Sequence, residues 1–276
     1  MNTPIYQVDS FTSVPFRGNP AGVCILASQQ PDEWMRSVAT EMNLSETAFL
    51  LKEEDAYRLR WFTPRVEVSL CGHATLAAAH VLWESNREPR TEQLTFHTVR
   101  GILKARYRDG WIELDFPAHT LSEANPPDGL LKALGVEAVE VRQYSNSYLV
   151  EVENEAQLRS MAPDMDKLER VQTRSVAVTT RSENPQYDFI SRYFAPKVGV
   201  PEDPVTGSAH CALTPYWAEK LGKTSLMAFQ ASARGGELRV QAAGERVILA
   251  GQAVTVIEGT LKTKEADLPI PQPPMG

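Results

Sequence analysis

The sequence has little of what marks several large protein classes. It holds three cysteines, Cys24, Cys71 and Cys211, among 276 residues, too few for a disulfide framework, so we expect a reducing compartment. No apolar run approaches the ~20 residues that span a bilayer. Residues 1–4 lack the charge and the apolar core of a secretory signal. We therefore expect a cytoplasmic protein with no membrane partner.

Positive charge and common cofactor motifs are also scarce. The 28 Lys and Arg stand against 35 Asp and Glu, which gives a net charge of −7 and makes nucleic acid an unfavourable partner. There is no G-x-G-x-x-G and no G-x-S-x-G, so neither a dinucleotide cofactor nor a serine nucleophile elbow is indicated. Four side chains nominally offer metal ligands: Cys71, His73, His210 and Cys211. Adjacent helical residues such as the last two point ~100° apart, so we expect no metal.

What is present is a set of short strand-like and helical patterns. Residues 74–83 and 209–218 have almost no polar face, and a helix that is apolar all round is a buried helix. Pro215 lies in the second segment and predicts a kink or two shorter pieces. Residues 31–43 form an amphipathic pattern with Trp34, Val38 and Met42 on one face. Strands are predicted at residues 5–8, 22–27, 47–52 and 57–63.

Two short stretches recur at nearly the same spacing. RWFTP at residues 60–64 resembles RYFAP at 192–196, an offset of 132, and GHA at 72–74 resembles GSA at 207–209, an offset of 135. Half the chain is 138 residues, so an internal duplication accounts for these spacings, with chance similarity as the alternative. Turn residues over 117–129 predict a boundary between halves at 1–118 and 119–276. We expect the last residues to pack back on the first half, and the proline-rich residues 268–276 to be extended.

Each copy places a glycine and a small polar residue at the start of a buried helix. A helix N-terminus exposes unpaired N–H groups and positive dipole, and glycine lets a ligand approach the backbone. Two such corners facing each other would bind an anion, most simply a carboxylate. Ordinary caps and turns are the alternative. Ionisable residues cluster at these corners, namely Glu46, Glu67, Cys71, His73, Glu202, Asp203 and His210.

Two of these side chains have chemistry of their own. A carboxylate such as Glu46 in a partly apolar cleft has a raised pKa and exchanges protons near neutral pH; a capping or strand-end carboxylate is the alternative. Cys71 stands beside a helix N-terminus, which predicts a lowered pKa and a reactive thiolate. A two-base racemase would need a matching thiol in the second copy, and no cysteine precedes Gly207 there.

Taken together, five motifs resemble the phenazine biosynthesis (PhzF-like) family: GNPAG at residues 18–22, NLSET at 43–47, FTP at 62–64, CGHAT at 71–75 and EDPVTGS at 202–208. The likeness runs over essentially the whole chain. It implies the diaminopimelate-epimerase-like α/β fold, in which two pseudo-symmetric halves each wrap a strongly curved sheet around a central helix. It also implies a cofactor-independent isomerase that is typically a homodimer.

The resemblance further implies roles for individual residues. The family's characterised enzyme isomerises trans-2,3-dihydro-3-hydroxyanthranilate by moving a proton from C3 to C1. Glu46 matches the glutamate that shuttles the proton, and His73 and Asp203 match the residues that assist it. The corners expected to bind the substrate around its carboxylate comprise Gly72, Ala74, Thr206, Gly207 and Ser208. Further candidates are Asn19, Ser45, Glu67 and Cys71.

Three functions stay open at this point. The first is isomerisation of a small carboxylate by one glutamate, with the substrate unassigned, because the corners resemble a broader branch of the family. The second is an epimerase or racemase that uses Glu46 and Cys71 on opposite faces of the substrate. The third is a non-catalytic interaction protein that keeps the scaffold.

Overall fold

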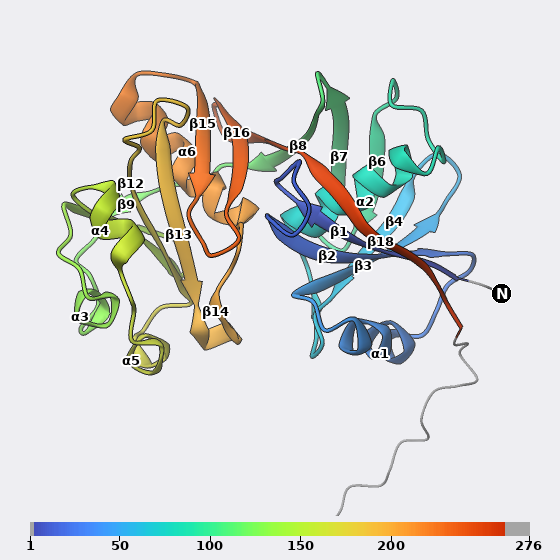
Figure 1. Cartoon of the computed structure of the whole chain (residues 1–276), viewed down its shortest axis with the longest axis horizontal. Coiled ribbons are helices and arrows are strands. Elements are labelled where there is room, and N and C mark those ends of the chain that lie inside the picture. The colour runs from blue at the N-terminus through green and yellow to red at the C-terminus, as the bar shows by residue number, and fades with distance from the viewer. Residues whose placement is uncertain (1–2, 263–276) are drawn as a thin grey trace, which may run out of the picture.

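A computed structural model describes residues 3–262. They form a mixed α/β molecule of two halves that lie side by side (Figure 1). In each half, strands curve around one long helix, as the predicted fold class requires. The extended tail predicted at residues 268–276 lies outside the described residues, and the domain boundary at 118 and 119 stays a prediction.

The first half contains β1 (Thr3–Ser10), β2 (Asn19–Leu26), α1 (Asp32–Met42), β3 (Glu46–Lys52), β4 (Tyr57–Phe62), β5 (Glu67–Val68), α2 (Gly72–Glu84), β6 (Leu94–Thr98), β7 (Gly101–Arg108) and β8 (Trp111–Pro117). The second contains β9 (Ser122–Glu123), α3 (Leu130–Leu134), β10 (Glu140–Tyr144), β11 (Ser147–Glu151), α4 (Glu155–Ser160), α5 (Met165–Arg170), β12 (Ser175–Arg181), β13 (Phe189–Ala195), the 3₁₀ turn η1 (Pro196–Val198), β14 (Val200–Glu202), α6 (Gly207–Leu221), β15 (Ser225–Gln230), β16 (Gly236–Ala243) and β17 (Arg246–Gly251). The last described strand is β18 (Ala253–Leu261).

The strand pairings of the first half recur in the second. β1–β2 is antiparallel, β2–β3 parallel, β3–β4 antiparallel and β4–β6 parallel. β10–β11, β11–β12, β12–β13 and β13–β15 repeat this series in the same order. The register matches as well, since Thr47 lies opposite Phe62 and Val176 lies opposite Phe194. The predicted duplication is therefore present in the fold.

The chain crosses between the halves twice. β8 pairs antiparallel with β17 and joins the two curved sheets. β18 then returns to the first half and pairs antiparallel with β1 (Figure 1). β9 pairs with β10 in the equivalent place. Each half is thus closed by a strand that follows the shared β8–β17 pair.

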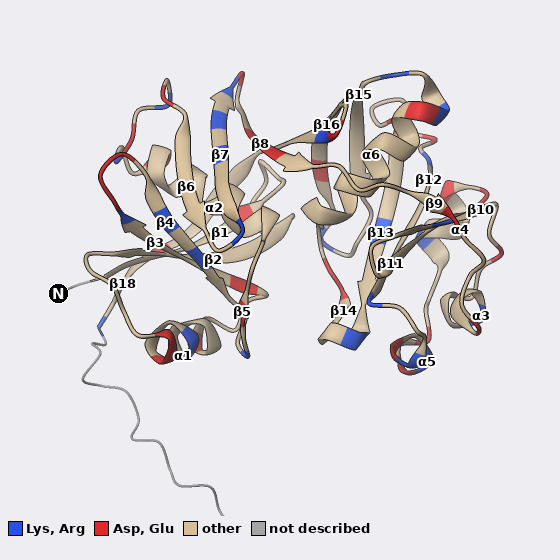
Figure 2. Ribbon diagram, turned by 180° about the vertical axis from the view of Figure 1, so that it is seen from behind, with Lys and Arg blue, Asp and Glu red and all other residues tan. Residues whose placement is uncertain are grey.

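The long helices α2 and α6 fill the centres of the two halves. Every residue of α2 from His73 to Ala79 is buried, and the helix is uncharged until its last residue, Glu84 (Figure 2). α6 is buried in the same way from Ala209 to Thr214. Both buried helices confirm the prediction from their apolar sequences. Within residues 3–262, no helix is both long and apolar enough to cross a membrane.

The predicted division of the second helix at Pro215 is wrong. α6 runs unbroken through the proline. A proline leaves the carbonyl four residues earlier without its helical donor, and here that carbonyl belongs to Cys211. It accepts the backbone N–H of His119 at 2.9 Å, from the segment that connects β8 and β9. A donor from elsewhere in the chain therefore satisfies the group that the proline exposes.

Candidate active site

The N-termini of α2 and α6 meet where the two halves face each other. A Cβ placed on Gly72 would lie 3.6 Å from the Cα of Gly207, and the reverse distance is also 3.6 Å. Cys71 and Thr206 are the N-cap residues of the two helices. The positive ends of two helix dipoles thus converge on one place, as the sequence predicted for the paired corners.

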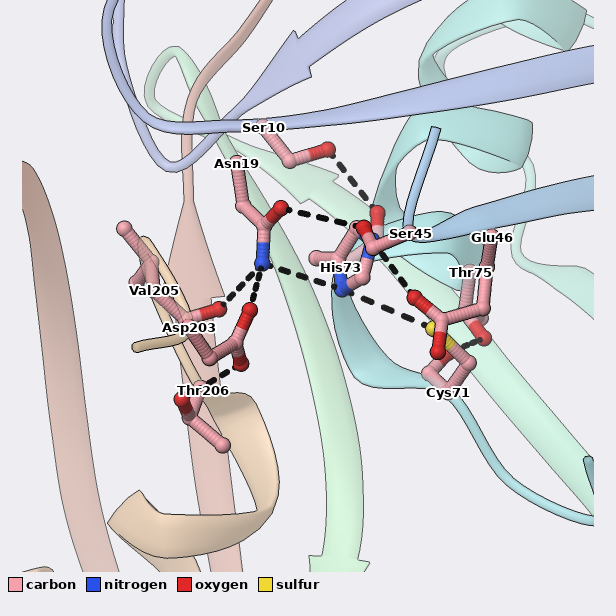
Figure 3. A network of polar contacts seen from close by, with 10 residues as sticks. All are labelled: Ser10, Asn19, Ser45, Glu46, Cys71, His73, Thr75, Asp203, Val205 and Thr206. Carbon is pink, nitrogen blue, oxygen red and sulfur yellow. Dashed lines mark hydrogen bonds and ion pairs between the residues drawn. The ribbon is translucent and has the colours of Figure 1, made fainter. Parts of the chain in front are cut away.

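Glu46 begins β3 and reaches toward the start of α2 (Figure 3). Its Oε2 lies 3.3 Å from Nε2 of His73, and its side chain is 18% exposed. Burial raises the pKa of Glu46, and hydrogen bonds from Ser45 and Cys71 oppose this shift. A carboxylate with a raised pKa is a stronger base than an ordinary one, and it exchanges protons closer to neutral pH.

His73 lies beside Glu46, and a hydrogen bond to its backbone carbonyl holds it in place. Its carbonyl accepts a hydrogen bond from Ser10 Oγ at 2.8 Å, which fixes the first turn of α2. Ser45 Oγ lies 3.3 Å from Nε2. Burial lowers the pKa of His73, and the charge of Asp203 opposes this. The imidazole is therefore neutral at neutral pH.

Asn19, at the start of β2, connects the two halves. Its Nδ2 donates to Asp203 Oδ1 and to the carbonyl of Val205, each at 2.8 Å. Both of its amide protons are used there, although Nδ1 of His73 is only 3.3 Å away. Asn19 is fully buried, so the candidate site from the first half is hydrogen-bonded directly to the loop that precedes α6.

Asp203 is the acidic group that the second half contributes. Its Oδ2 accepts from Thr206 Oγ1 at 2.5 Å. Burial raises the pKa of Asp203, His73 opposes the shift, and the charge of Glu46 adds to it. Gln230 braces this loop, donating to the Asp203 carbonyl at 2.7 Å and accepting the Thr206 N–H at 2.8 Å. Neither Gln230 nor Ser10 was predicted, because a single polar residue at a strand end carries no sequence signal.

The predicted lowering of the Cys71 pKa is wrong. Burial raises the pKa of this thiol well above its ordinary value, and the charges of Glu46 and Asp203 raise it further. The backbone N–H of Ala74 opposes the shift without reversing it. Cys71 is therefore a protonated thiol. Its Sγ lies 3.5 Å from Nδ1 of His73.

The groups around its two ring nitrogens decide the tautomer of His73. Nε2 faces two oxygen acceptors, Glu46 Oε2 and Ser45 Oγ, each 3.3 Å away. Nδ1 faces the donor groups of Asn19 and Cys71. We therefore assign the His73 proton to Nε2. That N–H faces Glu46 and Ser45.

Several of the residues described so far form one hydrogen-bonded group, which consists of Asn19, Ser45, Glu46, Cys71, His73 and Asp203. Other predicted residues lie outside this hydrogen-bonded group. Both oxygens of Glu67 accept from Arg60 at 2.7 Å, and Glu202 is bound by Arg192 in the same way. His210 donates from Nδ1 to the Thr206 carbonyl at 2.9 Å, and burial lowers its pKa to about 4. Ala74 is buried in the first turn of α2, and Ser208 is exposed in the first turn of α6.

Three side chains present metal-binding atoms close together. Those of Glu46, Cys71 and His73 lie within 4.8 Å of one another. The nominal set of Cys71, His73, His210 and Cys211 does not assemble, because His210 binds the Thr206 carbonyl and Cys211 Sγ faces the carbonyl of Gly207.

Comparison with known proteins gives consistent matches over nearly the whole chain. Residues 8–259 match the family described as phenazine biosynthesis-like protein. An uncharacterised isomerase of Halalkalibacterium halodurans is 52% identical over 262 residues, which cover 95% of this chain and 99% of that protein. A crystal structure of a PhzF-family protein from Enterococcus faecalis superposes with a TM-score of 0.91 at 38% identity, covering 95% and 100% of the two chains. A predicted epimerase of Pseudomonas aeruginosa shares the fold, with a TM-score of 0.74 at 21% identity and coverage of 95% and 99%.

Proposed function

Because the chain belongs to the phenazine biosynthesis-like (PhzF) family and is an isomerase, we propose that it moves a proton between two carbons of a small carboxylate substrate. Glu46 is the acid and base, and no cofactor takes part. One observation carries the proposal: a largely buried glutamate of raised pKa stands beside a neutral imidazole, near the meeting point of two helix N-termini.

The proposed reaction needs one carboxyl group. Ionised Glu46 removes a proton from a carbon next to a double bond or carbonyl, so a C–H bond breaks and an O–H bond forms. The electron pair delocalises into the unsaturated system of the substrate. Neutral Glu46 then returns the proton to a different carbon on the same face. The apolar surroundings that raise the pKa of Glu46 make both steps accessible near neutral pH.

The surrounding groups support the charges in this scheme. The two helix N-termini hold the substrate carboxylate through unpaired N–H groups and positive dipoles. The Nε2–H of His73 and the hydroxyl of Ser45 hold Glu46 in place. Asp203 binds a donor group of the substrate, and its link through Asn19 sets its position relative to His73.

The geometry favours this scheme over a two-base epimerase. Opposite-face chemistry requires two groups on opposite sides of the substrate, but Cys71 and Glu46 lie together within the same 4.8 Å group. Cys71 is also protonated, and its counterpart at the start of α6 is Thr206, which has no thiol. The non-catalytic alternative is set aside because three relatives, 49–52% identical to this chain, are named as uncharacterised isomerases. The homodimer and the cytoplasmic location stay predictions.

The test uses proton NMR in D2O with trans-2,3-dihydro-3-hydroxyanthranilate. We expect conversion by the wild type and by Glu67→Gln, a matched carboxylate variant outside the hydrogen-bonded group, and no conversion by Glu46→Gln. Turnover by Glu46→Gln would contradict the assignment of the base. If the wild type leaves this compound unchanged, the substrate is wrong, and small unsaturated and keto carboxylates are screened with the same three proteins.

A further inference from the structure

We propose that Glu46, Cys71 and His73 form an inhibitory site for one thiophilic divalent cation, such as Zn²⁺ or Cd²⁺. The cation replaces the proton of the Cys71 thiol, binds between Cys71 Sγ and His73 Nδ1, and engages the carboxylate of Glu46. The binding follows from the geometry alone. The inhibition rests on the proposed function, because it requires Glu46 to be the base.

The spacing of the donor atoms suits a tetrahedral cation. Zn²⁺ binds sulfur at about 2.3 Å and nitrogen or oxygen at about 2.0–2.2 Å, so tetrahedral ligands stand about 3.3–3.7 Å apart. Cys71 Sγ and His73 Nδ1 are 3.5 Å apart. The carboxylate of Glu46 hydrogen-bonds the same thiol, and the three donor groups lie within 4.8 Å. Because a spacing of up to 4.8 Å exceeds that of tetrahedral ligands, the side chains must move closer together when the cation binds.

The imidazole already presents the correct nitrogen. In the assigned tautomer Nδ1 carries the lone pair, so no proton has to leave His73. Nε2–H stays bonded to Ser45, whose Oγ is 3.3 Å away. A metal-bound histidine normally donates its other N–H to such a partner, which orients the ring. Ser45 is therefore the outer partner of the site.

The charge of the site also favours a cation. Glu46 and Asp203 are two largely buried carboxylates, and within residues 3–262 neither forms an ion pair with Lys or Arg. Binding converts the thiol to a thiolate, forms an M–S bond and releases one proton to solvent. The thiolate and Glu46 then balance the charge of the cation. Sulfur, nitrogen and oxygen together are the donor set that Zn²⁺ accepts and that Mg²⁺ and Ca²⁺ avoid.

The consequence for activity follows from the identity of the ligands. A cation bound to Glu46 removes the base, so the substrate and the cation exclude each other. The cation is an inhibitor and not a cofactor, which agrees with cofactor-independent proton transfer.

The test titrates untagged, chelator-treated protein with Cd²⁺ and follows the ultraviolet charge-transfer absorption of the Cd–S bond. We expect one equivalent to bind in the wild type and in two matched controls, Cys24→Ser and Cys211→Ser, which alter the other buried cysteines. Cys71→Ser should lose the band. Glu46→Gln keeps the thiol and should weaken binding at least about tenfold, so the test does not depend on one variant. Wild-type affinity should rise about tenfold per pH unit, because one proton is released.

Two results would overturn the site: no Cd–S band in the wild type, or a band of unchanged strength in Cys71→Ser. A second arm adds Zn²⁺ during turnover. Inhibition that substrate relieves supports the whole proposal. Stoichiometric binding without inhibition supports the cation site and contradicts the role of Glu46, so failure of the proposed function is seen separately.

Discussion

The two halves share a topology but not a chemistry. The matched register places Ser175 of β12 where the first half has Glu46, because each precedes the residue opposite Phe194 or Phe62. Ser175 Oγ is hydrogen-bonded to Ser147 Oγ and to the Tyr193 hydroxyl, each at 2.7 Å. The second half therefore has a hydroxyl network at the position of the base. Duplication supplied two helix N-termini. At the first corner a carboxylate and an imidazole lie together, with Glu46 Oε2 3.3 Å from Nε2 of His73. At the second corner Asp203 is bonded to Asn19 and Thr206, and the ring of His210 is bonded to the Thr206 carbonyl.

Structural supports are repeated more faithfully than the side chains of the proposed active site. Arg60 binds Glu67 between β4 and β5, and Arg192 binds Glu202 between β13 and β14, both through two hydrogen bonds. A side chain one turn into each helix also bonds back to the N-cap carbonyl, Thr75 to Cys71 and His210 to Thr206. The scaffold around each corner is thus held in the same way, while the reacting groups differ.

Among the matched positions of the two halves, substitution of the proposed base, Glu46, should lower activity most. Glu46→Gln should lower kcat by about 10³-fold, in the range of general acid–base contributions. Ser175→Ala, at the equivalent position, should change kcat less than about tenfold, because the side chains bonded to Ser175 are hydroxyl groups and include no carboxylate. Steady-state rates measure both. Equal losses in the two variants would show that the halves share the chemistry.

Asp203 should be the residue of the second half on which activity depends most. Asp203→Asn keeps the size of the side chain and removes its charge, so kcat/KM should fall by about 10²-fold. Glu202→Gln is the matched control, since this neighbouring carboxylate is bound to Arg192 and lies outside the candidate site. A comparable loss in both variants would point to loop folding as the cause.

The two arginine pairs should differ in stability because they differ in depth. Arg192 is 13% exposed and also donates to the carbonyls of Leu158 and Met161. Arg192→Met leaves these carbonyls and a partly buried carboxylate without a hydrogen-bond donor. This change should lower the free energy of unfolding by about 3 kcal/mol. Arg60 is more exposed, at 21%, and Arg60→Met should cost about 1 kcal/mol. Urea unfolding monitored by fluorescence gives both values, and the reverse order would contradict this explanation.

The pKa of Glu46 also predicts a pH-dependent stability. Because the folded pKa is raised, the folded state binds protons more tightly than the unfolded chain. Wild type and Glu46→Gln should be about equally stable below the ordinary pKa of 4.5. As pH rises through the folded pKa, the wild type loses stability and the variant does not. Thermal unfolding should give the variant the higher Tm at neutral pH, and a constant difference at all pH values would refute the raised pKa.

The smallest effect is expected at Pro215, which has no counterpart in α2. Pro215→Ala restores a backbone N–H whose usual acceptor, the Cys211 carbonyl, already binds His119. The gain from better helix propensity is then offset by an unpartnered donor, and the stability should change by less than about 1 kcal/mol. Thermal unfolding measures it. A gain of about 3 kcal/mol would show that the proline strains the helix.

Local composition was enough to predict some features, and tertiary contacts decided the others. The apolar run of α2 predicts a buried helix, and the RWFTP and RYFAP repeats predict the duplication. The roles of Glu46, His73 and Asp203 came from motif resemblance and remain to be tested. Asn19 and Asp203 are 184 residues apart, and no periodicity brings them together. The pKa of Cys71 depends on how deeply α2 is buried, so the predicted lowering of that pKa was wrong. The predicted division of α6 at Pro215 was also wrong, because the N–H of His119 satisfies the carbonyl that the proline exposes.

The most direct test of whether Glu46 alone transfers the proton, on one face of the substrate, follows a deuterium label. trans-2,3-Dihydro-3-hydroxyanthranilate that carries deuterium at C3 is converted in ordinary water, and NMR locates the label in the product. If Glu46 alone carries the proton from C3 to C1, a measurable fraction of product retains deuterium at C1, on the face from which it left. Complete loss of the label, with solvent hydrogen added to the opposite face, would show a second base in the other half and contradict the account.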